Sequence, residues 1–302
     1  MEPVEIVEVG ARDGLQNEKT LVSTGDKLTL IRKLIAAGSR RLEIASFVNP
    51  KRVPQMADAE AVVEGLGQPD GITRIGLVLN RRGAERALAS GVDELGAVAI
   101  ATDGFGIRNQ AQTSAESVTE AAAILAMARS EGRSAQVTIS VAFGCPFEGR
   151  VDPARVVAMA AELAQAGPRE IALADTIGVA VPGQVSALVR SVQAVVGAVP
   201  LRLHFHNTRN TAVANTWAGY LAGVRTFDSS LGGLGGCPFA PNATGNVATE
   251  DLAYLFAESG VATGLDLAAL IAAAGWLSDQ VMERTLPGMV SRAGGFPVPA
   301  TA

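Results

Sequence analysis

The only two histidines of this 302-residue chain, His204 and His206, lie two positions apart in the segment LRLHFHN. The segment alternates apolar and polar residues, which is typical of a β-strand. Because the side chains of a strand alternate between its two sides, both imidazoles point the same way. Two neutral imidazoles that converge from one strand supply half of a metal site, and a hydrogen-bonded pair of core histidines is the alternative. The residues that reach the same place decide between these interpretations.

Five other residues have types that suit catalysis. Arg12 and Asp13 follow the first predicted strand, whereas Glu43 and Asp175 are acidic residues in strands that are otherwise largely apolar. Each also has a structural interpretation, because buried acids form ion pairs and Arg–Asp pairs are common at surfaces. Cys237 lies in the segment LGGLGGCPFA, which is too glycine-rich to be a packed element. A loop of this kind either closes over a site or is merely a flexible connection.

Hydrophobic periodicity predicts eight strands that alternate with helices. A glycine closes a helix just before a strand at Gly38, Gly91, Gly167 and Gly223. This pattern predicts an α/β fold, a (β/α)₈ barrel. A doubly wound sheet is the second choice, but the segment GARDG after the first strand is not the glycine-rich phosphate turn of that fold. The strands are expected at residues 4–10, 41–46, 74–79, 95–101, 136–143, 170–175, 201–206 and 224–230.

The regions between and after the strands set the domain organisation. Residues 102–113 are expected to form a polar loop, and helices beyond the eighth strand are expected from residue 249 onward. The prediction is one catalytic barrel domain over residues 1–286, including these C-terminal helices, followed by a mobile Gly/Pro-rich tail over residues 287–302.

Composition restricts the partners. Hydrophobic residues make up 48% of the chain and charged residues 18%, which indicates a globular protein with a large core. A net charge of −5 and the lack of basic clusters argue against a nucleic-acid or membrane partner, so a small-molecule substrate is expected. The longest apolar run, residues 267–277, is shorter than the roughly 18 residues that span a bilayer.

Cysteine usage and the N-terminus indicate the compartment. Cys145 and Cys237 are too few for a disulfide framework, and the first residues lack the pattern of a signal peptide. A cytoplasmic protein is therefore expected. Both cysteines lie in a GCPF tetrapeptide, and we interpret Cys145, in the tighter setting, as structural.

In a barrel of this kind, the functional groups lie at the carboxyl ends of the strands. The predicted topology brings Asp13 to the two histidines, and a carboxylate with two imidazoles suits a divalent cation such as Mg²⁺, Mn²⁺ or Co²⁺. Arg12 would then be a fixed positive charge beside the metal, suited to stabilising an oxyanion.

The chain resembles the 3-hydroxy-3-methylglutaryl-CoA lyase family, in the metal-dependent barrel superfamily that also contains isopropylmalate and homocitrate synthases and carboxyltransferases. The matching segments span nearly the whole predicted barrel, and the last of them is specific to the lyases. They are EVGARDGLQNEK, IASFVNPKRVPQMAD, GCPFEGRV, ADTIGV, HFHNT and GLGGCPFAPNATGNVATEDL.

The resemblance implies a magnesium or manganese cofactor and a fourth metal ligand, Asn246, which joins Asp13, His204 and His206. The implied reaction is a retro-Claisen cleavage of 3-hydroxy-3-methylglutaryl-CoA, or of a close 3-hydroxy-3-alkyl analogue, to acetyl-CoA and acetoacetate or the corresponding keto acid. It also implies a homodimer and a place in leucine catabolism and ketone-body formation.

Catalytic roles follow from the same resemblance. Arg12 is expected to stabilise an enolate and Cys237 to be a catalytic cysteine on a mobile loop, with Glu43 and Asp175 supporting the site. The general base stays open, as does the group that reprotonates the enolate, for which Cys237 is one candidate. Substrate-binding residues are predicted in the loops after the first and fourth strands, at Gln16, Lys19 and Asn109.

The chain departs from the family pattern in three places. Asn207-Thr208 stands where most of these lyases have Asp-Thr, which removes a charge beside a ligand. Arg209-Asn210 replaces a pair that usually ends in glycine, and the loop over residues 102–109 carries extra glycines. These departures affect the accepted acyl chain more than the reaction type.

Two other functions remain open on the sequence alone. A Claisen-type synthase that joins an acyl-CoA to a 2-oxo acid shares the histidine and Arg-Asp motifs, although the loop of Cys237 argues against it. A barrel scaffold that has lost turnover is the second alternative. Substitution of Cys237 separates an active lyase from a scaffold.

Overall fold

The computed structural model describes residues 1–236 and 245–297. Eight strands form a closed barrel in sequence order, and β1 pairs with β8 to close it. All neighbouring pairs are parallel, which confirms the predicted (β/α)₈ barrel and excludes the doubly wound sheet. The strands are β1 Glu5–Glu8, β2 Arg41–Ser46, β3 Thr73–Val78, β4 Glu94–Ile100, β5 Ser134–Ser140, β6 Ile171–Asp175, β7 Leu201–Phe205 and β8 Thr226–Ser229.

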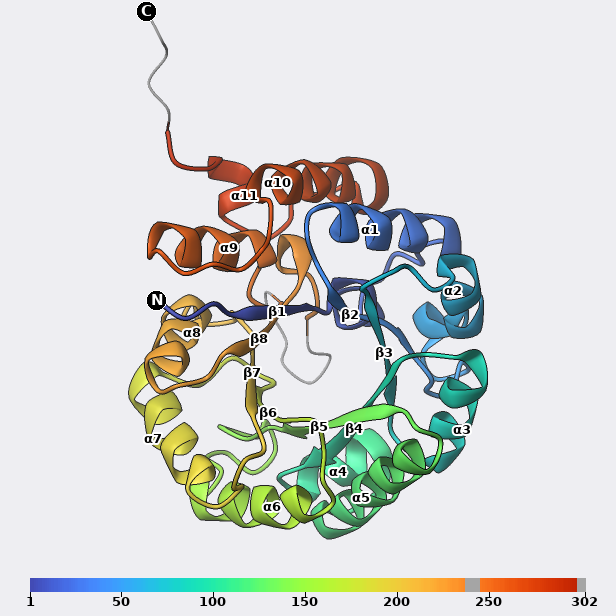
Figure 1. Cartoon of the computed structure of the whole chain (residues 1–302), viewed down its shortest axis with the longest axis vertical. Coiled ribbons are helices and arrows are strands. Elements are labelled where there is room, and N and C mark those ends of the chain that lie inside the picture. The colour runs from blue at the N-terminus through green and yellow to red at the C-terminus, as the bar shows by residue number, and fades with distance from the viewer. Residues whose placement is uncertain (237–244, 298–302) are drawn as a thin grey trace, which may run out of the picture.

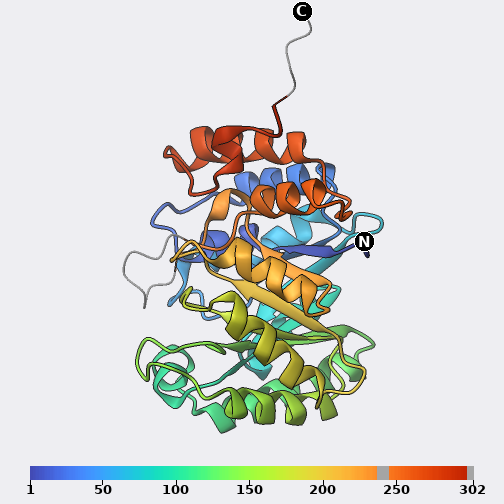
Figure 2. The same ribbon diagram turned by 90° about the vertical axis from the view of Figure 1, so that its left-hand side faces the viewer.

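Helices surround the strands as an outer ring (Figure 1). Eight of them lie between strands: α1 Thr24–Ala36, α2 Ala59–Leu66, α3 Arg81–Ser90, α4 Asp103–Gln110, α5 Ser114–Ser130, α6 Pro153–Gln165, α7 Pro182–Gln193 and α8 Ala212–Leu221. Three more follow the last strand, as predicted: α9 Thr249–Glu258, α10 Leu267–Trp276 and α11 Val290–Ala293. These three stack on the α1 side of the barrel (Figure 2).

Local sequence signals set several helix ends. The Asp152 side chain accepts a hydrogen bond from the backbone of Ala154 at the start of α6, with Pro153 at the first helical position. Thr113 and Glu116 form a reciprocal capping box at the start of α5. Gly91 ends α3 in the left-handed conformation, as its position before β4 predicts.

The prediction of a polar loop over residues 102–113 was wrong, because α4 occupies Asp103–Gln110. Its two glycines disfavour a helix on propensity alone. Burial of Phe105, which is 4% exposed, outweighs that cost, and the Asp103 carboxylate accepts a hydrogen bond from the backbone of Ser114. Tertiary packing, which periodicity does not report, therefore forms this helix at the edge of the barrel mouth.

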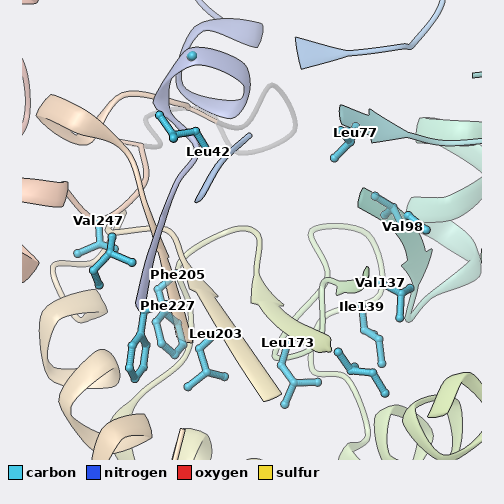
Figure 3. Packing of buried hydrophobic residues seen from close by; sticks show 14 of the residues in the cluster. Leu42, Leu77, Val98, Val137, Ile139, Leu173, Leu203, Phe205, Phe227 and Val247 are labelled. Atoms are coloured by element: carbon cyan, nitrogen blue, oxygen red, sulfur yellow. The ribbon is translucent and has the colours of Figure 1, made fainter. Parts of the chain in front are cut away.

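An apolar layer fills the space between the strands and the outer helices. Figure 3 shows Leu203, Phe205 and Phe227 in this layer, and all three are buried. A side chain in place of Gly219 in α8 would approach within 2.3 Å of Leu203, so the glycine allows helix and strand to pack closely. The ring of Phe227 also packs against that of Phe256 in α9, at 5.6 Å between centroids.

The interior of the barrel is charged, in contrast to the branched apolar layers that usually fill such barrels. Five buried side chains alternate in sign and contact one another in a row. We call them the interior charge row: Glu94, Arg41, Glu170, Arg202 and Asp228. All are at most 5% exposed, and each charge has at least one opposite charge beside it, which offsets part of the cost of burial.

The first part of the glycine-rich segment is packed, contrary to the prediction. Leu231 and Leu234 are almost fully buried, and Leu231–Gly233 form a short 3₁₀ turn. Gly235 has a φ of 108°, and a Cβ there would lie 2.3 Å from the Asn246 amide. The glycine is thus required by a close approach beside the site. Cys237 lies outside the described residues.

The described part of the predicted tail contacts the barrel. The backbone of Gly288 donates to the carbonyl of Gly232, and the backbone N–H groups of Met289 and Val290 donate to the buried Asp251 carboxylate. Across residues 1–236 and 245–297, no helix combines the length and apolar character needed to cross a membrane.

Candidate metal centre and active site

A cavity of about 160 Å³ opens at the carboxyl ends of the strands. Its wall combines charged groups with an apolar side formed by Leu77, Val98 and Phe105. This is the end of the barrel at which the sequence predicted the functional groups. The ionisable side chains on the wall are Arg12, Asp13, Glu43, Arg202, His204, His206 and Asp228.

Strand β7 and the turn that follows it place both histidines at this cavity. Leu203 and Phe205 face the outer layer, so the alternation of the strand turns His204 and His206 inward. The two rings lie 5.2 Å apart between centroids, and the histidines are 8% and 5% exposed. The prediction that both imidazoles point the same way is confirmed.

The turn after β1 brings a carboxylate to the histidines. Residues Gly10–Gly14 form a single π-helical turn that carries Arg12 and Asp13. One ligand atom from each of Asp13, His204 and His206 lies within 4.8 Å of the others, a spacing that a single metal ion can bridge. The donor set of one carboxylate and two imidazoles suits a hard or borderline divalent cation.

Asn246 completes the group and tests whether the site fits a cation. Its side-chain amide nitrogen donates to Asp13 Oδ2 at 2.7 Å and to the carbonyl of Leu234 at 3.0 Å. These bonds fix the orientation of the amide, and the buried Oδ1 has no hydrogen-bond partner among the described residues. A buried acceptor without a donor is costly, and a metal ion would satisfy it. The residues present therefore fit a cation.

Arg12 is held rigidly beside this group. Its guanidinium donates to Asp13 Oδ1 at 2.5 Å and to Glu43 Oε2 at 2.6 Å. The guanidinium is positioned before any substrate arrives, which suits stabilisation of a developing negative charge. Glu43 thus acts on the site through Arg12, as a partner of the arginine.

A family model described as HMGL-like matches residues 3–276 of this chain. The chain belongs to the HMGL-like family. It is 46% identical to a protein named (R)-citramalyl-CoA lyase from Chloroflexus aurantiacus, over 97% of this chain and 96% of that protein. It is also 44% identical to a 3-hydroxy-3-isohexenylglutaryl-CoA/hydroxymethylglutaryl-CoA lyase from Pseudomonas aeruginosa, over 89% of each.

A solved structure gives the same assignment. The chain superposes with a TM-score of 0.92 on an HMG-CoA lyase from Acinetobacter baumannii in complex with coenzyme A and 3-methylmalate, at 38% identity over 98% of both chains. Since the relatives of this HMGL-like protein are named CoA lyases, it is an enzyme of the carbon–carbon lyase class. The resemblance stated from the sequence is confirmed.

Electrostatics in this HMGL-like site favour ligands that are ready to bind a cation. Burial acts to raise the pKa of Asp13, but Arg12 and the two histidines outweigh it and hold that pKa well below its usual range. Burial and the neighbouring His204 lower the pKa of His206 to about 4. An ionised carboxylate and a neutral imidazole are the forms that bind metals.

His204 differs from His206 because it has a carboxylate partner. Burial acts to lower the pKa of His204, but the hydrogen bond and charge of Asp228, together with Asp13, raise it above its ordinary value. Sequence reasoning missed Asp228 and its neighbour Arg202. Two signals were available in the sequence. The alternation of side chains along β7 places Arg202 on the same side as His204, and β8 contains an acid, Asp228.

The remaining predicted site residues divide into three groups. Gln16 and Asn109 line the cavity, whereas Lys19 is exposed and is not part of the described lining. Asp175 ends β6 and accepts backbone hydrogen bonds at 2.9 and 2.8 Å from the loop that follows it, so it fixes that loop and does not face the cavity. Cys237 lies outside the described residues, and its catalytic role stays a prediction.

The departures from the family pattern have local explanations. Asn207 Oδ1 accepts a hydrogen bond from the backbone of Ala212 at 3.1 Å and so caps the start of α8, a function that the amide performs without a charge. Arg209 donates to the carbonyls of Ile177 and Gly178 in the loop after β6. Both residues therefore shape loops around the histidines and leave the ligand set intact.

Proposed function

We propose that this enzyme cleaves the C2–C3 bond of a short, carboxylate-bearing 3-hydroxy-3-methylacyl-CoA and releases acetyl-CoA and a keto acid. (R)-citramalyl-CoA, which would yield pyruvate, and 3-hydroxy-3-methylglutaryl-CoA, which would yield acetoacetate, are the two members of this class to test. The observation that carries the proposal is the convergence of Asp13, His204, His206 and Asn246 beside a preorganised Arg12.

The proposed cofactor is Mg²⁺ or Mn²⁺, held by Asp13, His204, His206 and Asn246. When bound, such a cation polarises the substrate hydroxyl and carboxylate oxygens. Asp13 can bind the cation because Arg12 keeps its carboxylate ionised. Asn246 can bind it because hydrogen bonds from its amide nitrogen to Asp13 and Leu234 fix the side chain. The ligands are thus oriented by the chain itself.

Bond cleavage separates charge in a way that Arg12 fits. As the C2–C3 bond breaks, its electron pair moves onto the thioester to form an enolate, and the C3 hydroxyl gives its proton to a general base and becomes a ketone. Arg12 is a donor fixed by Asp13 and Glu43, so it stabilises the enolate oxygen without reorganisation. C2 then takes up a proton, for which Cys237 is the proposed donor.

The apolar side of the cavity supports a short substituent on C3. Leu77, Val98 and Phe105 line it, and α4, which carries Phe105, forms part of its wall. A methyl group fits such a wall, while a long prenyl-like chain would have to displace the buried Phe105. The homodimer and a role in leucine catabolism or ketone-body formation stay predictions from the resemblance, and the cytoplasmic location stays a prediction from the cysteines and the first residues.

The test is acetyl-CoA release from each thioester with Mg²⁺ or Mn²⁺, with pyruvate and acetoacetate measured in parallel. We expect release that chelation by EDTA abolishes and added metal restores. A matched pair of variants uses the two GCPF tetrapeptides: Cys237→Ser should lose most activity, and Cys145→Ser, in a buried position bonded to Thr102, should keep it. No acetyl-CoA from either thioester or from longer 3-alkyl analogues would refute the proposal.

A further inference from the structure

The interior charge row ends at one of the two histidines of the site. Arg202 and His204 lie two apart on β7 and therefore face the same side of the strand, where Asp228 of the neighbouring β8 reaches both. Asp228 Oδ2 lies 3.0 Å from His204 Nδ1, and Asp228 Oδ1 lies 3.3 Å from Arg202 Nε. One carboxylate thus hydrogen-bonds a histidine through one oxygen and forms an ion pair with an arginine through the other.

Arg202 is in turn fixed from its other end. Its terminal nitrogen lies 3.4 Å from Glu170, which contacts Arg41 at 2.6 Å, and Arg41 pairs with Glu94. These side chains come from or adjoin β2, β4, β6 and β7, so the row crosses the barrel interior. A displacement of Asp228 would remove one of the two carboxylates beside the buried Arg202, which is unfavourable.

His206 has no equivalent support. Within residues 1–236 and 245–297, its buried Nδ1 has no hydrogen-bond partner, and the carboxylate near its Nε2 is Asp13, at 3.9 Å. Two histidines of one site therefore differ in one respect: a carboxylate behind the ring orients His204 alone. Because both rings are buried in the same site, the contact between Asp228 and His204 is specific and does not follow from burial alone.

We infer that Asp228, held by Arg202, is a positioning residue that fixes the Nδ1–H tautomer of His204 and leaves Nε2 as its metal-binding atom. The inference rests on the proposed metal-dependent lyase function. A neutral imidazole donates through one nitrogen and binds a metal through the other, and a carboxylate acceptor on the first decides which is which. The interior charge row therefore acts on the reaction through His204.

The tautomer can be read directly because the chain has two histidines. Selective ¹⁵N-histidine labelling reports only these two rings. We expect the wild-type protein, without metal and at a pH above the histidine range, to show His204 protonated at Nδ1 and not at Nε2. Addition of Mg²⁺ should shift the Nε2 resonance of His204 and leave its Nδ1 proton in place. A proton on Nε2 of His204 would overturn the inference, and no variant is needed to see it.

Metal affinity provides the second test, with a matched control. Asp228→Asn should weaken Mn²⁺ binding about 10- to 100-fold, the usual effect of losing an orienting partner, and Arg202→Met should weaken it about tenfold or less. The control is Asp93→Asn, because Asp93 also accepts from a buried arginine, Arg74, at 2.8 and 3.0 Å, but at the amino ends of β3 and β4. Equal Mn²⁺ affinities for Asp228→Asn and Asp93→Asn would contradict the role of Asp228.

The kinetic readout separates positioning from substrate binding. At saturating metal, Asp228→Asn should lower kcat and leave the KM of the thioester within about twofold, since the two Asp228 oxygens are directed at His204 and Arg202. The NMR spectra and the Mn²⁺ titrations are recorded without thioester, so they test the role of Asp228 independently of the substrate. A protein that passes them but cleaves no thioester refutes only the proposed substrate, and a protein that cleaves thioesters but fails them refutes only the role of Asp228.

Discussion

Strand β7 faces two regions of opposite chemistry. On its outer side, Leu203 and Phe205 lie in an apolar layer against the helices, and on its inner side Arg202 and His204 lie among buried charges. The outer layer gains free energy by removing apolar surface from water. Burial of charges in the interior costs free energy, which offsets part of that gain even though each charge has an opposite charge beside it. The same strand therefore stabilises the fold with one face and positions a reactive site with the other.

The largest expected effect on stability lies in the outer layer. Phe227→Ala should lower the free energy of unfolding by about 3–5 kcal/mol, since Phe227 is fully buried against α8 and Phe256. Urea unfolding measures this change. The folded fraction should keep the Mn²⁺ affinity and kcat of the wild type. A loss of Mn²⁺ affinity in fully folded protein would show that the two faces are not separable.

On the inner face, substitution of Arg12 should lower activity, whereas substitution of Phe227 in the outer layer lowers stability. Arg12→Lys keeps a positive charge but loses the planar fork that contacts both Asp13 and Glu43, so kcat should fall about 10²- to 10³-fold. Acetyl-CoA release at saturating thioester measures this loss, and Mn²⁺ affinity serves as the control that the site is intact. An unchanged kcat would remove Arg12 from the proposed mechanism.

Glu8 is a buried acid of another kind, because a proton neutralises it in the folded state. Among the residues that the structure describes, no cation pairs with Glu8. It accepts hydrogen bonds from Gly10, Leu231 and Thr249, and burial raises its pKa from 4.5 to about 7. The folded state therefore holds a proton between these pH values that the unfolded chain has released. Stability must fall as pH rises through this window, by up to about 3 kcal/mol for this one group.

Glu8→Gln should remove that part of the pH dependence. The amide oxygen can still accept from both backbone N–H groups, and the amide nitrogen can donate to Thr249. Urea unfolding across the window should give a shallower fall of stability than in the wild type. Glu250, whose pKa burial also raises to about 7, keeps a residual slope in both proteins. Equal slopes would mean that Glu8 is not protonated in the folded state.

The smallest effect is expected for an ion pair outside both regions. Arg86 and Glu60 pair at 2.7 Å on the surface, where their side chains are 30% and 48% exposed. Glu60→Ala should change the free energy of unfolding by less than about 1 kcal/mol. Asp228→Asn should cost several times more in the same urea titration, because it leaves Arg202 buried with a weaker partner. Similar costs would show that burial of the interior charge row is energetically unimportant.

Periodicity and turn signals predicted the barrel and located β2 at its observed ends, residues 41–46. The same parity argument placed His204 and His206 on one side, and topology brought Asp13 to them. Long-range packing was not available to such reasoning. Helix α4 depends on burial of Phe105, and the charge row depends on contacts such as Arg41 with Glu94, 53 residues apart. These contacts have no local signature.

Asn246 shows a different limit. An asparagine in a glycine-rich segment has no pattern that marks it as a ligand, and only the family resemblance singled it out. The structure gives the physical reason, since its amide nitrogen is hydrogen-bonded to Asp13 and Leu234 and its oxygen has no hydrogen-bond partner within residues 1–236 and 245–297. Asp228 had neither a motif nor a resemblance to identify it; an acid inside β8 was its local signal, and its 3.0 Å distance to His204 Nδ1 reveals the contact.

The central claim is that the charged inner face of the barrel holds one divalent cation at its carboxyl end. A crystal grown with Mn²⁺ and measured for anomalous scattering tests it most directly. The account predicts one anomalous peak bonded to Asp13, His206, Asn246 Oδ1 and His204 Nε2, with Asp228 still on Nδ1 of His204. A peak elsewhere, no peak at a Mn²⁺ concentration that supports activity, or a His204 ring turned with Nδ1 toward the metal would contradict it.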